Sequence, residues 1–314
     1  HYCLFINCVF LFLLSIPKRS IMTESIPHRS NSISHGNQLL ACKYLRQYRN
    51  GKMSRGCQFN TTDTILFIVN FHYFNYTPVH FIEHRSFIEF SKRFKYSVDL
   101  IFVGAVESEA IGVYGTGVPI MGFYSYRSYI NAYDLFNSRQ GFNYYGFMFL
   151  NDDSCLNPWV LNTLPFNVSY YERKGELYES NRWKFTSYKN TFGITNFEAV
   201  TLALEELNRY DVHSGPYHVT TQPYWGRGDF FYVYRRHSQF VRDILQTMYE
   251  YRVFLEIAVP TAVAMVNGSG IPNCNHIGRL FVRTCAHIHP TKFSNMLMRQ
   301  KCINRIINST FYWD

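Results

Sequence analysis

Two continuous apolar segments dominate the first half of the sequence. The segments "DTILFIVNF" (63–71) and "VDLIFVGA" (98–105) are rich in β-branched and aromatic residues, and each has the length of a strand. Strands without a polar side are typical of sheets that are covered on both faces. Between them, the segment 77–94 has apolar residues at helical spacing after Pro78. Strand, helix and strand in this order predict the start of a parallel α/β sheet.

A second unit of the same kind follows. In the segment 122–139, Tyr126, Ile130 and Tyr133 recur at helical spacing, and the apolar run "YYGFMFL" (144–150) comes next as a further strand. Together these segments predict an α/β fold with a Rossmann-like, mixed and mostly parallel sheet flanked by helices.

The C-terminal half continues with helices and extended segments. Thr195 and Glu198 form a capping box ahead of an apolar-periodic helix. The segment 219–236 reads as two short extended runs around a glycine-rich turn, and 238–251 has the spacing of a helix. Pro260 is expected to kink or end any helix in the apolar segment around it.

The N-terminal segment differs from the rest. Its apolar run, 3–16, is shorter than the roughly 20 residues that a spanning helix needs, so 1–21 is interpreted as a signal peptide or a truncated signal anchor. Residues 22–62 are polar and basic and are interpreted as a flexible stem. The globular domain is expected to cover 63–314.

These features favour a Golgi or ER membrane protein with a lumenal domain, or a secreted protein. Five Asn-x-Ser/Thr triplets are compatible with the secretory lumen. Lys18 and Arg19 point the other way, because positive charge on that flank of an anchor would keep the domain cytoplasmic. The membrane is a partner through the N-terminal segment only.

Charge and cysteine content narrow the classes of function. Of the net charge of +9, residues 1–60 carry eight Lys or Arg and one acidic residue, so the remainder is nearly neutral. With no recognition-helix signature, we expect no nucleic-acid partner. The eight cysteines include no Cys-x-x-Cys pair, which argues against the usual zinc and redox spacings. A C-terminal zinc site remains an alternative, with the possible ligands Cys274, His276, Cys285, His287 and His289.

Three polar residues directly follow the strand 144–150. Asn151, Asp152 and Asp153 stand at a strand's carboxyl end, where open α/β sheets bind ligands. Adjacent carboxylates repel each other unless they share a cation, and Mg²⁺ or Mn²⁺ prefers one or two carboxylates together with phosphate oxygens. Asn, Asp and Ser are also common turn residues, so an ordinary turn is the alternative.

The segment "YYGFMFLNDDSCLNPWVL" (144–161) resembles the strand and acidic turn of GT-A-type nucleotide-diphospho-sugar glycosyltransferases. Their Asp-x-Asp motif holds a divalent metal against the diphosphate of the donor. The resemblance implies Asn151 and Asp153 as metal ligands, with asparagine in the place of the first aspartate, and Asp152 between them as a donor-binding residue.

The resemblance also implies roles for residues elsewhere. In "AHIHPTKFSN" (286–295), His289 is expected to ligate the metal and Lys292 to offset the charge of the diphosphate. Arg127 is expected to reach the uracil or the phosphates of the donor. A surface position is the alternative for His289 and for Arg127.

Two carboxylates remain as catalytic candidates. Glu256 has apolar neighbours that would desolvate it and raise its pKa, which suits a base for the acceptor hydroxyl. Asp229 follows Trp225, Gly226 and Gly228, which could form a sugar-facing platform. A buried pairing partner for Glu256 and a turn position for Asp229 are the structural alternatives.

Taken together, the sequence predicts a GT-A-like enzyme that moves a sugar from a nucleotide-sugar donor to a glycan, protein or lipid acceptor with a divalent cation, Mn²⁺ or Mg²⁺. The first alternative is a catalytically inactive carbohydrate-binding or adaptor protein with the same fold. The second is a metal-dependent phosphoryl or nucleotidyl transferase that uses the same carboxylates.

Overall fold

The two apolar segments form neighbouring parallel strands in the computed structural model of the chain. Strand β3 (Thr64–Asn70) is buried at every position, and it pairs in parallel with β4 (Ser97–Gly104). Helix α2 (Ile82–Ser91) lies between them in the sequence. The predicted strand, helix and strand are therefore confirmed.

The structure describes residues 42–49, 52–55, 57, 62–71, 82–110, 112–116, 122–137, 141–152, 154–177, 188–209, 220–271 and 287–288. All of them belong to one compact unit, His35–Asp314.

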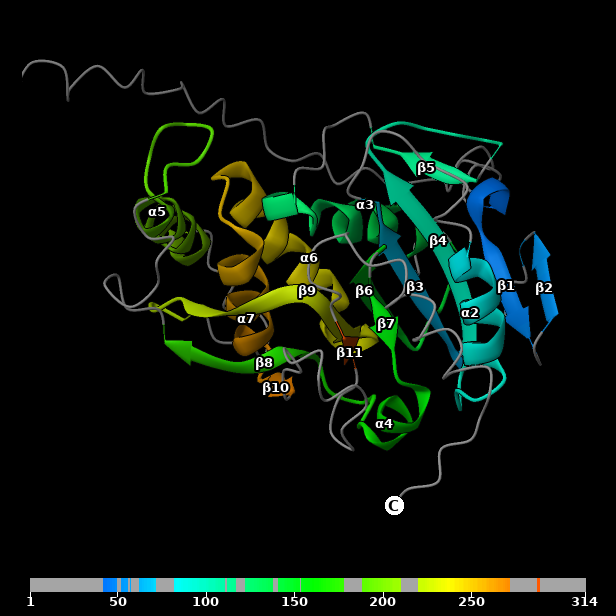
Figure 1. The fold of residues 1–314 in the computed structure, drawn as a ribbon. Helices are drawn as coiled ribbons and strands as arrows, with labels where there is room; N and C mark the ends of the chain where they lie inside the picture. Colours follow the sequence, from blue (N-terminus) through cyan, green and yellow to red (C-terminus); the bar gives the residue numbers. More distant parts are fainter. Residues whose placement is uncertain are drawn as a thin grey trace, which may run out of the picture. The chain divides into compact units, whose positions relative to one another are not determined.

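The central sheet is mixed and open. Eight of its strands run in the order β10-β8-β9-β6-β3-β4-β1-β2, and β5 pairs with β4 (Figure 1). Of the eight pairings in the described sheet, four are parallel and four antiparallel, so the mixed α/β sheet is confirmed, whereas parallel pairs do not predominate. The strands not yet given are β1 (Arg46–Arg49), β2 (Lys52–Arg55), β5 (Val113–Gly115), β6 (Gly146–Asn151), β8 (Tyr170–Leu177), β9 (Tyr224–Tyr234) and β10 (Ser269–Ile271). A separate two-stranded sheet joins β7 (Cys155–Leu156) to β11 (His287–Ile288).

Helices cover both faces of the sheet. On β3, Leu66 and Ile68 face a core shared with α3, α5, α6 and α7, whereas Ile65, Phe67 and Val69 face a core shared with α2 and α4. This two-sided burial explains why the strand has no polar face. The helices are α3 (Arg127–Phe136), α4 (Pro158–Thr163), α5 (Asn196–Arg209), α6 (Arg235–Glu250) and α7 (Leu255–Met265), with a short 3-10 turn at Gly122–Tyr124.

The folded unit begins before residue 63. Strand β1 pairs with β4, and Cys42 forms a disulfide bond with Cys57. The expected stem 22–62 therefore contains part of the sheet. Its polar strand is accommodated because Arg46, which is only 3% exposed, donates to the carbonyl of Gly112 at 3.2 Å.

Two other local expectations need correction. The segment with Gly226 and Gly228 is not a turn but lies inside the continuous strand β9. A Cβ atom at Gly228 would lie 2.7 Å from Leu255 Cγ, so glycine is needed where α7 packs on this strand. Helix α7 continues through Pro260 instead of ending there.

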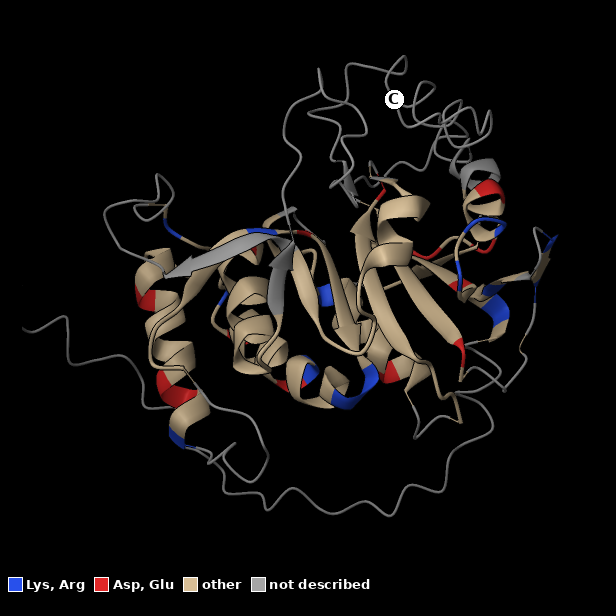
Figure 2. Cartoon of the chain, turned by 90° about the horizontal axis from the view of Figure 1, so that it is seen from below, with Lys and Arg blue, Asp and Glu red and all other residues tan. Residues whose placement is uncertain are grey.

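Charged residues are sparse in the centre of the sheet. Strands β3, β4 and β6 contain Asp99 as their only charged residue, whereas β1, β2 and β8 carry several, and Figure 2 shows the central strands largely uncoloured. Within the described residues, no helix has the length and apolar character needed to cross a bilayer. The expected signal peptide or anchor, 1–21, lies outside them.

Candidate functional site

The parallel strands β3 and β6 both end on asparagine. Asn70 and Asn151 are register partners at the carboxyl ends of these strands, and both side chains are fully buried. Asp152 follows directly, is 1% exposed, and its backbone N–H donates to the Asn70 carbonyl at 2.9 Å. We refer to this end of the sheet as the carboxyl edge.

The side-chain amide of Asn151 is held on both sides. Its Oδ1 accepts a hydrogen bond from Asn70 Nδ2 at 3.2 Å, and its Nδ2 donates to Asp229 Oδ1 at 2.9 Å. A role for Asn151 as a metal ligand would require its oxygen to bind the cation in addition to, or instead of, the Asn70 amide.

A second carboxyl group lies close to Asp229. Glu256 is in the first turn of α7, and its Oε2 is shielded from solvent without a hydrogen-bond partner among the described residues. Burial, together with the charge of Asp229, raises the pKa of Glu256 to about 8, while Arg227 acts in the opposite direction. The two catalytic candidates of the sequence are thus electrostatic neighbours, and Asn151 contacts one of them, Asp229.

Arg127 lies elsewhere. It begins α3 and points to α6, where it donates to Gln246 Oε1 and lies 4.9 Å from the centre of the Tyr249 ring. In this conformation it packs between two helices. Trp225 is half-buried and packs against the core on the side of α7.

The C-terminal segment returns to the acidic turn. Strand β11 pairs with β7 in antiparallel register, with Ile288 opposite Cys155. The residue directly before His289 therefore lies beside a residue two positions after Asp153 (Figure 1). Asp153, His289 and Lys292 themselves lie outside the described residues. Across the part of the chain that is described, no group of three or more His, Cys, Asp or Glu side chains is arranged to hold a metal ion.

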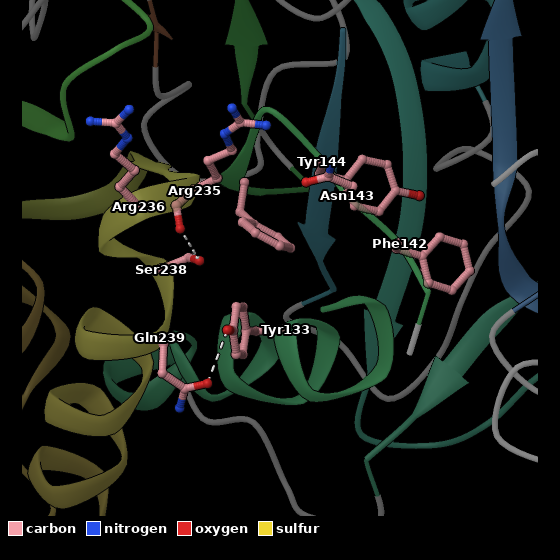
Figure 3. A pocket seen from close by; sticks show the side chains of 9 residues that line it. Tyr133, Phe142, Asn143, Tyr144, Arg235, Arg236, Ser238 and Gln239 are labelled. Atoms are coloured by element: carbon pink, nitrogen blue, oxygen red, sulfur yellow. Dashed lines mark hydrogen bonds between the residues drawn. The ribbon is translucent and has the colours of Figure 1, made fainter. Parts of the chain in front are cut away.

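A hollow of about 430 Å³ lies at the opposite end of β6, which we call the amino edge. Arg235 and Arg236 line it from the start of α6, and Tyr133 of α3 donates to Gln239 across it at 3.1 Å (Figure 3). None of its described lining residues is acidic, and none is a site residue predicted from the sequence. The presence of this hollow therefore does not identify the functional site.

The sequence reasoning did not identify Asn70 or Ser128. Ser128 Oγ donates to Asn70 Oδ1 at 2.6 Å, so both belong to the network that ends on Asp229. One signal was present, because Asn70 ends the first apolar strand in the same way that Asn151 ends the third.

Comparisons with known proteins identify no relative. No protein-family model matches the chain, and no curated protein matches it. The functional assignment consequently depends on the residues of the carboxyl edge themselves.

Proposed function

We propose that the protein is a metal-dependent glycosyltransferase that moves a sugar from a nucleotide-sugar donor to a glycan, protein or lipid acceptor. The observation that carries this proposal is the meeting of Asn151, Asp152, Asp229 and Glu256 at the carboxyl edge. Ligands of open α/β sheets bind at this edge. The resemblance of 144–161 to GT-A enzymes adds the reaction type.

The acidic turn would hold the divalent cation. Because the Asn151 amide is held by Asn70 and Asp229, Asp152 would take its place and provide a hard carboxylate ligand of the kind that Mg²⁺ and Mn²⁺ prefer. Asp153 and His289 would complete the site, and the pairing of β7 with β11 supports their proximity. When bound, the cation would offset negative charge on the diphosphate leaving group. Lys292 would offset further negative charge on the diphosphate. Arg127 could contribute in the same way only if it left its contacts with α6.

Glu256 is the preferred base. A pKa of about 8 lets its carboxyl group exchange a proton near neutral pH, as acceptance of the acceptor's hydroxyl proton requires. Asp229 is less suited, because its Oδ1 already accepts a hydrogen bond from Asn151. In an inverting reaction, Glu256 would remove the hydroxyl proton as the oxygen attacks the anomeric carbon.

The disulfide bond supports a secretory location. Disulfides such as Cys42–Cys57 persist in oxidising compartments and are rare in the cytosol. We therefore place the folded domain in the lumen of the ER or Golgi, or outside the cell. Removal of N-linked glycans by a glycosidase should increase the gel mobility of the expressed protein, and an unchanged mobility together with free thiols would contradict this location.

Calorimetry with nucleotide sugars tests the function. The full-length protein should take up at least one nucleotide sugar in the presence of Mn²⁺ and lose this uptake with a chelator. Asp152→Asn should weaken binding about tenfold or more, because it removes one charged ligand. Asp134→Asn, on the exposed side of α3, is the matched control and should bind as the wild type does. Absence of manganese-dependent uptake across a panel of nucleotide sugars would overturn the proposal.

A catalytically inactive carbohydrate-binding protein is the second candidate. Two observations favour it: the Asn151 amide is already held by protein groups, and both Asp152 carboxylate oxygens are shielded from solvent. This candidate predicts glycan binding without donor turnover. Product analysis separates all three classes, because a phosphoryl or nucleotidyl transferase would cleave between phosphates and leave the anomeric carbon untouched.

A further inference from the structure

Three buried side chains and one partly buried carboxylate form a directional series of hydrogen bonds across the carboxyl edge. The Ser128 hydroxyl donates to Asn70, the Asn70 amide donates to Asn151, and the Asn151 amide donates to Asp229. The distances are 2.6, 3.2 and 2.9 Å. We call these four residues the amide relay. It links α3 to β9 through the ends of β3 and β6.

The order of the donors fixes the orientation of each amide. Because Asn70 uses its oxygen to accept from Ser128, its nitrogen must face Asn151. Asn151 therefore presents its oxygen to Asn70 and its nitrogen to Asp229. A rotation of either amide by half a turn would oppose donor to donor or acceptor to acceptor, at a cost that buried groups do not recover from water.

Asparagine at position 151 is consequently matched to aspartate at position 229. An aspartate at 151 would have no proton to donate, and two carboxylates would stand where Asn151 Nδ2 and Asp229 Oδ1 are now 2.9 Å apart. One of the two would have to take up a proton. In this chain the negative charge of the pair is therefore carried by Asp229 on β9, and the first position of the acidic turn, Asn151, is neutral.

We propose that Asn151 is a positioning residue that, oriented by Asn70 and Ser128, holds the Asp229 carboxylate beside Glu256. The inference rests on the proposed function only where it concerns turnover. The placement of charge that it describes can be measured on the folded protein whether or not a substrate is known.

A reciprocal exchange tests the proposal. Asn151→Asp should lower the melting temperature by about 5–10 °C, because the partly buried Asp229 carboxylate loses its donor and meets a second carboxyl group. Asp229→Asn should lower it less, since the new side-chain oxygen can still accept from Asn151 while the new amide nitrogen needs a partner. The double variant N151D/D229N restores a donor and an acceptor to the pair and should recover most of the loss.

A matched control separates the loss of this hydrogen bond from a general effect of replacing a buried asparagine by aspartate. Asn157, 3% exposed, caps α4 by accepting from the N–H groups of Trp159 and Val160. Aspartate performs the same capping, so Asn157→Asp should change the melting temperature by less than about 2 °C. An equal loss in Asn157→Asp and Asn151→Asp, or no recovery in the double variant, would overturn the proposed hydrogen bond.

Placement of the charge is read from the titration of Glu256 by carbon NMR. Asp229 raises and Arg227 lowers the pKa of this group in the wild type. The pKa should fall in Asp229→Asn, and it should also fall in N151D/D229N, where the charge moves to β6. An unchanged titration in the stable double variant would mean that Asn151 has only a structural role.

Turnover gives a separate result. If the protein is a transferase, the double variant should lose turnover about 100-fold, since stability returns without the charge on β9. Recovery of both stability and turnover would overturn the positioning role. Failure of the wild type to bind any nucleotide sugar would instead overturn the proposed function and leave the stability and titration results to decide on the relay.

Discussion

The two ends of β6 hold their polar groups in opposite ways. At the carboxyl edge, Asn151 and Asp152 are buried, and Asp229 and Glu256 lie nearby. At the amino edge, Arg235 and Arg236 are exposed around an open hollow. One end is acidic and mostly buried, whereas the other is basic and accessible to water.

This difference shows at which end the positions of the polar side chains are fixed by the fold. A buried polar group must find its partner inside the protein, so its position is fixed by the fold. An exposed arginine is satisfied by water and can adopt many positions at little cost. We therefore propose that the chemistry takes place at the carboxyl edge, although a described hollow lies at the amino edge.

Removal of polar groups at each end tests this contrast most strongly. Glu256→Gln should lower turnover of a nucleotide-sugar substrate by about 100-fold or more, because the acceptor proton loses its base. The amino-edge variant R235Q/R236Q should stay within about twofold of the wild type, as exposed substitutions usually do. Initial rates at saturating donor measure both. The reverse result would move the active site to the hollow.

The pH dependence of stability isolates the same carboxyl group. Glu256 has a pKa of about 8 in the folded protein, above its unfolded value of 4.5, so the folded state retains a proton that the unfolded state has lost. Its contribution to stability is present below pH 4.5 and is lost as pH rises toward 8. The loss between pH 5 and pH 8 is on the order of 3 kcal/mol, or roughly 5–10 °C in melting temperature.

Glu256→Gln provides the control for this measurement. Glutamine cannot ionise, so the variant should lose less stability than the wild type between pH 5 and pH 8. Calorimetric scans at both values measure the difference. Parallel pH profiles for the two proteins would show that Glu256 ionises normally and would weaken its assignment as the base.

Elements that depend on local pattern could be predicted from the sequence. The strands β3, β4 and β6 are mostly apolar, with the buried Asp99 as the charged exception in β4. The capping box forms as expected, with the Thr195 N–H and Glu198 Oε2 at 2.7 Å. These strands can be recognised without knowledge of their neighbours in space, because burial on both faces favours apolar side chains at most positions.

Elements that depend on distant partners could not be predicted. Strand β1 has a polar sequence, and it is buried because Gln47 donates to Asp99 at 3.2 Å and Arg46 reaches Gly112. The site shows the same limit. The apolar neighbours of Glu256 in the sequence indicate that its surroundings are apolar. Only the fold brings Asn70, 81 residues earlier in the chain, to Asn151.

Close packing of α7 on β9 gives a smaller prediction. In Gly228→Ala, the added Cβ would lie 2.7 Å from Leu255 Cγ and 2.8 Å from its carbonyl oxygen. Since the backbone of α7 cannot move freely, we expect a loss of about 1–3 kcal/mol. Turnover should fall with it, because Glu256 follows Leu255 directly. Thermal unfolding and rates of the purified variant test this. Full stability would show that α7 is free to shift and does not hold Glu256 rigidly.

The smallest effect is expected for an exposed ion pair beside the amino edge. Arg242 of α6 donates to both carboxylate oxygens of Asp134 on α3, at 2.8 and 2.7 Å. The Asp134 side chain is 45% exposed, so Asp134→Asn should cost only about 0.5 kcal/mol at low salt. In about 1 M salt the difference from the wild type should vanish, since the Debye length is then about 3 Å.

Most of the loss in Asn151→Asp should persist at the same salt concentration, because Ser128, Asn70 and Asn151 are buried and Asp229 is partly buried, so the contact is screened less than a surface ion pair. Melting temperatures of both variants across a salt series therefore compare the two ends of β6 directly. Equal salt sensitivity would mean that solvent ions reach Asn151 and Asp229, and the carboxyl edge would then lose the enclosure that distinguishes it from the amino edge.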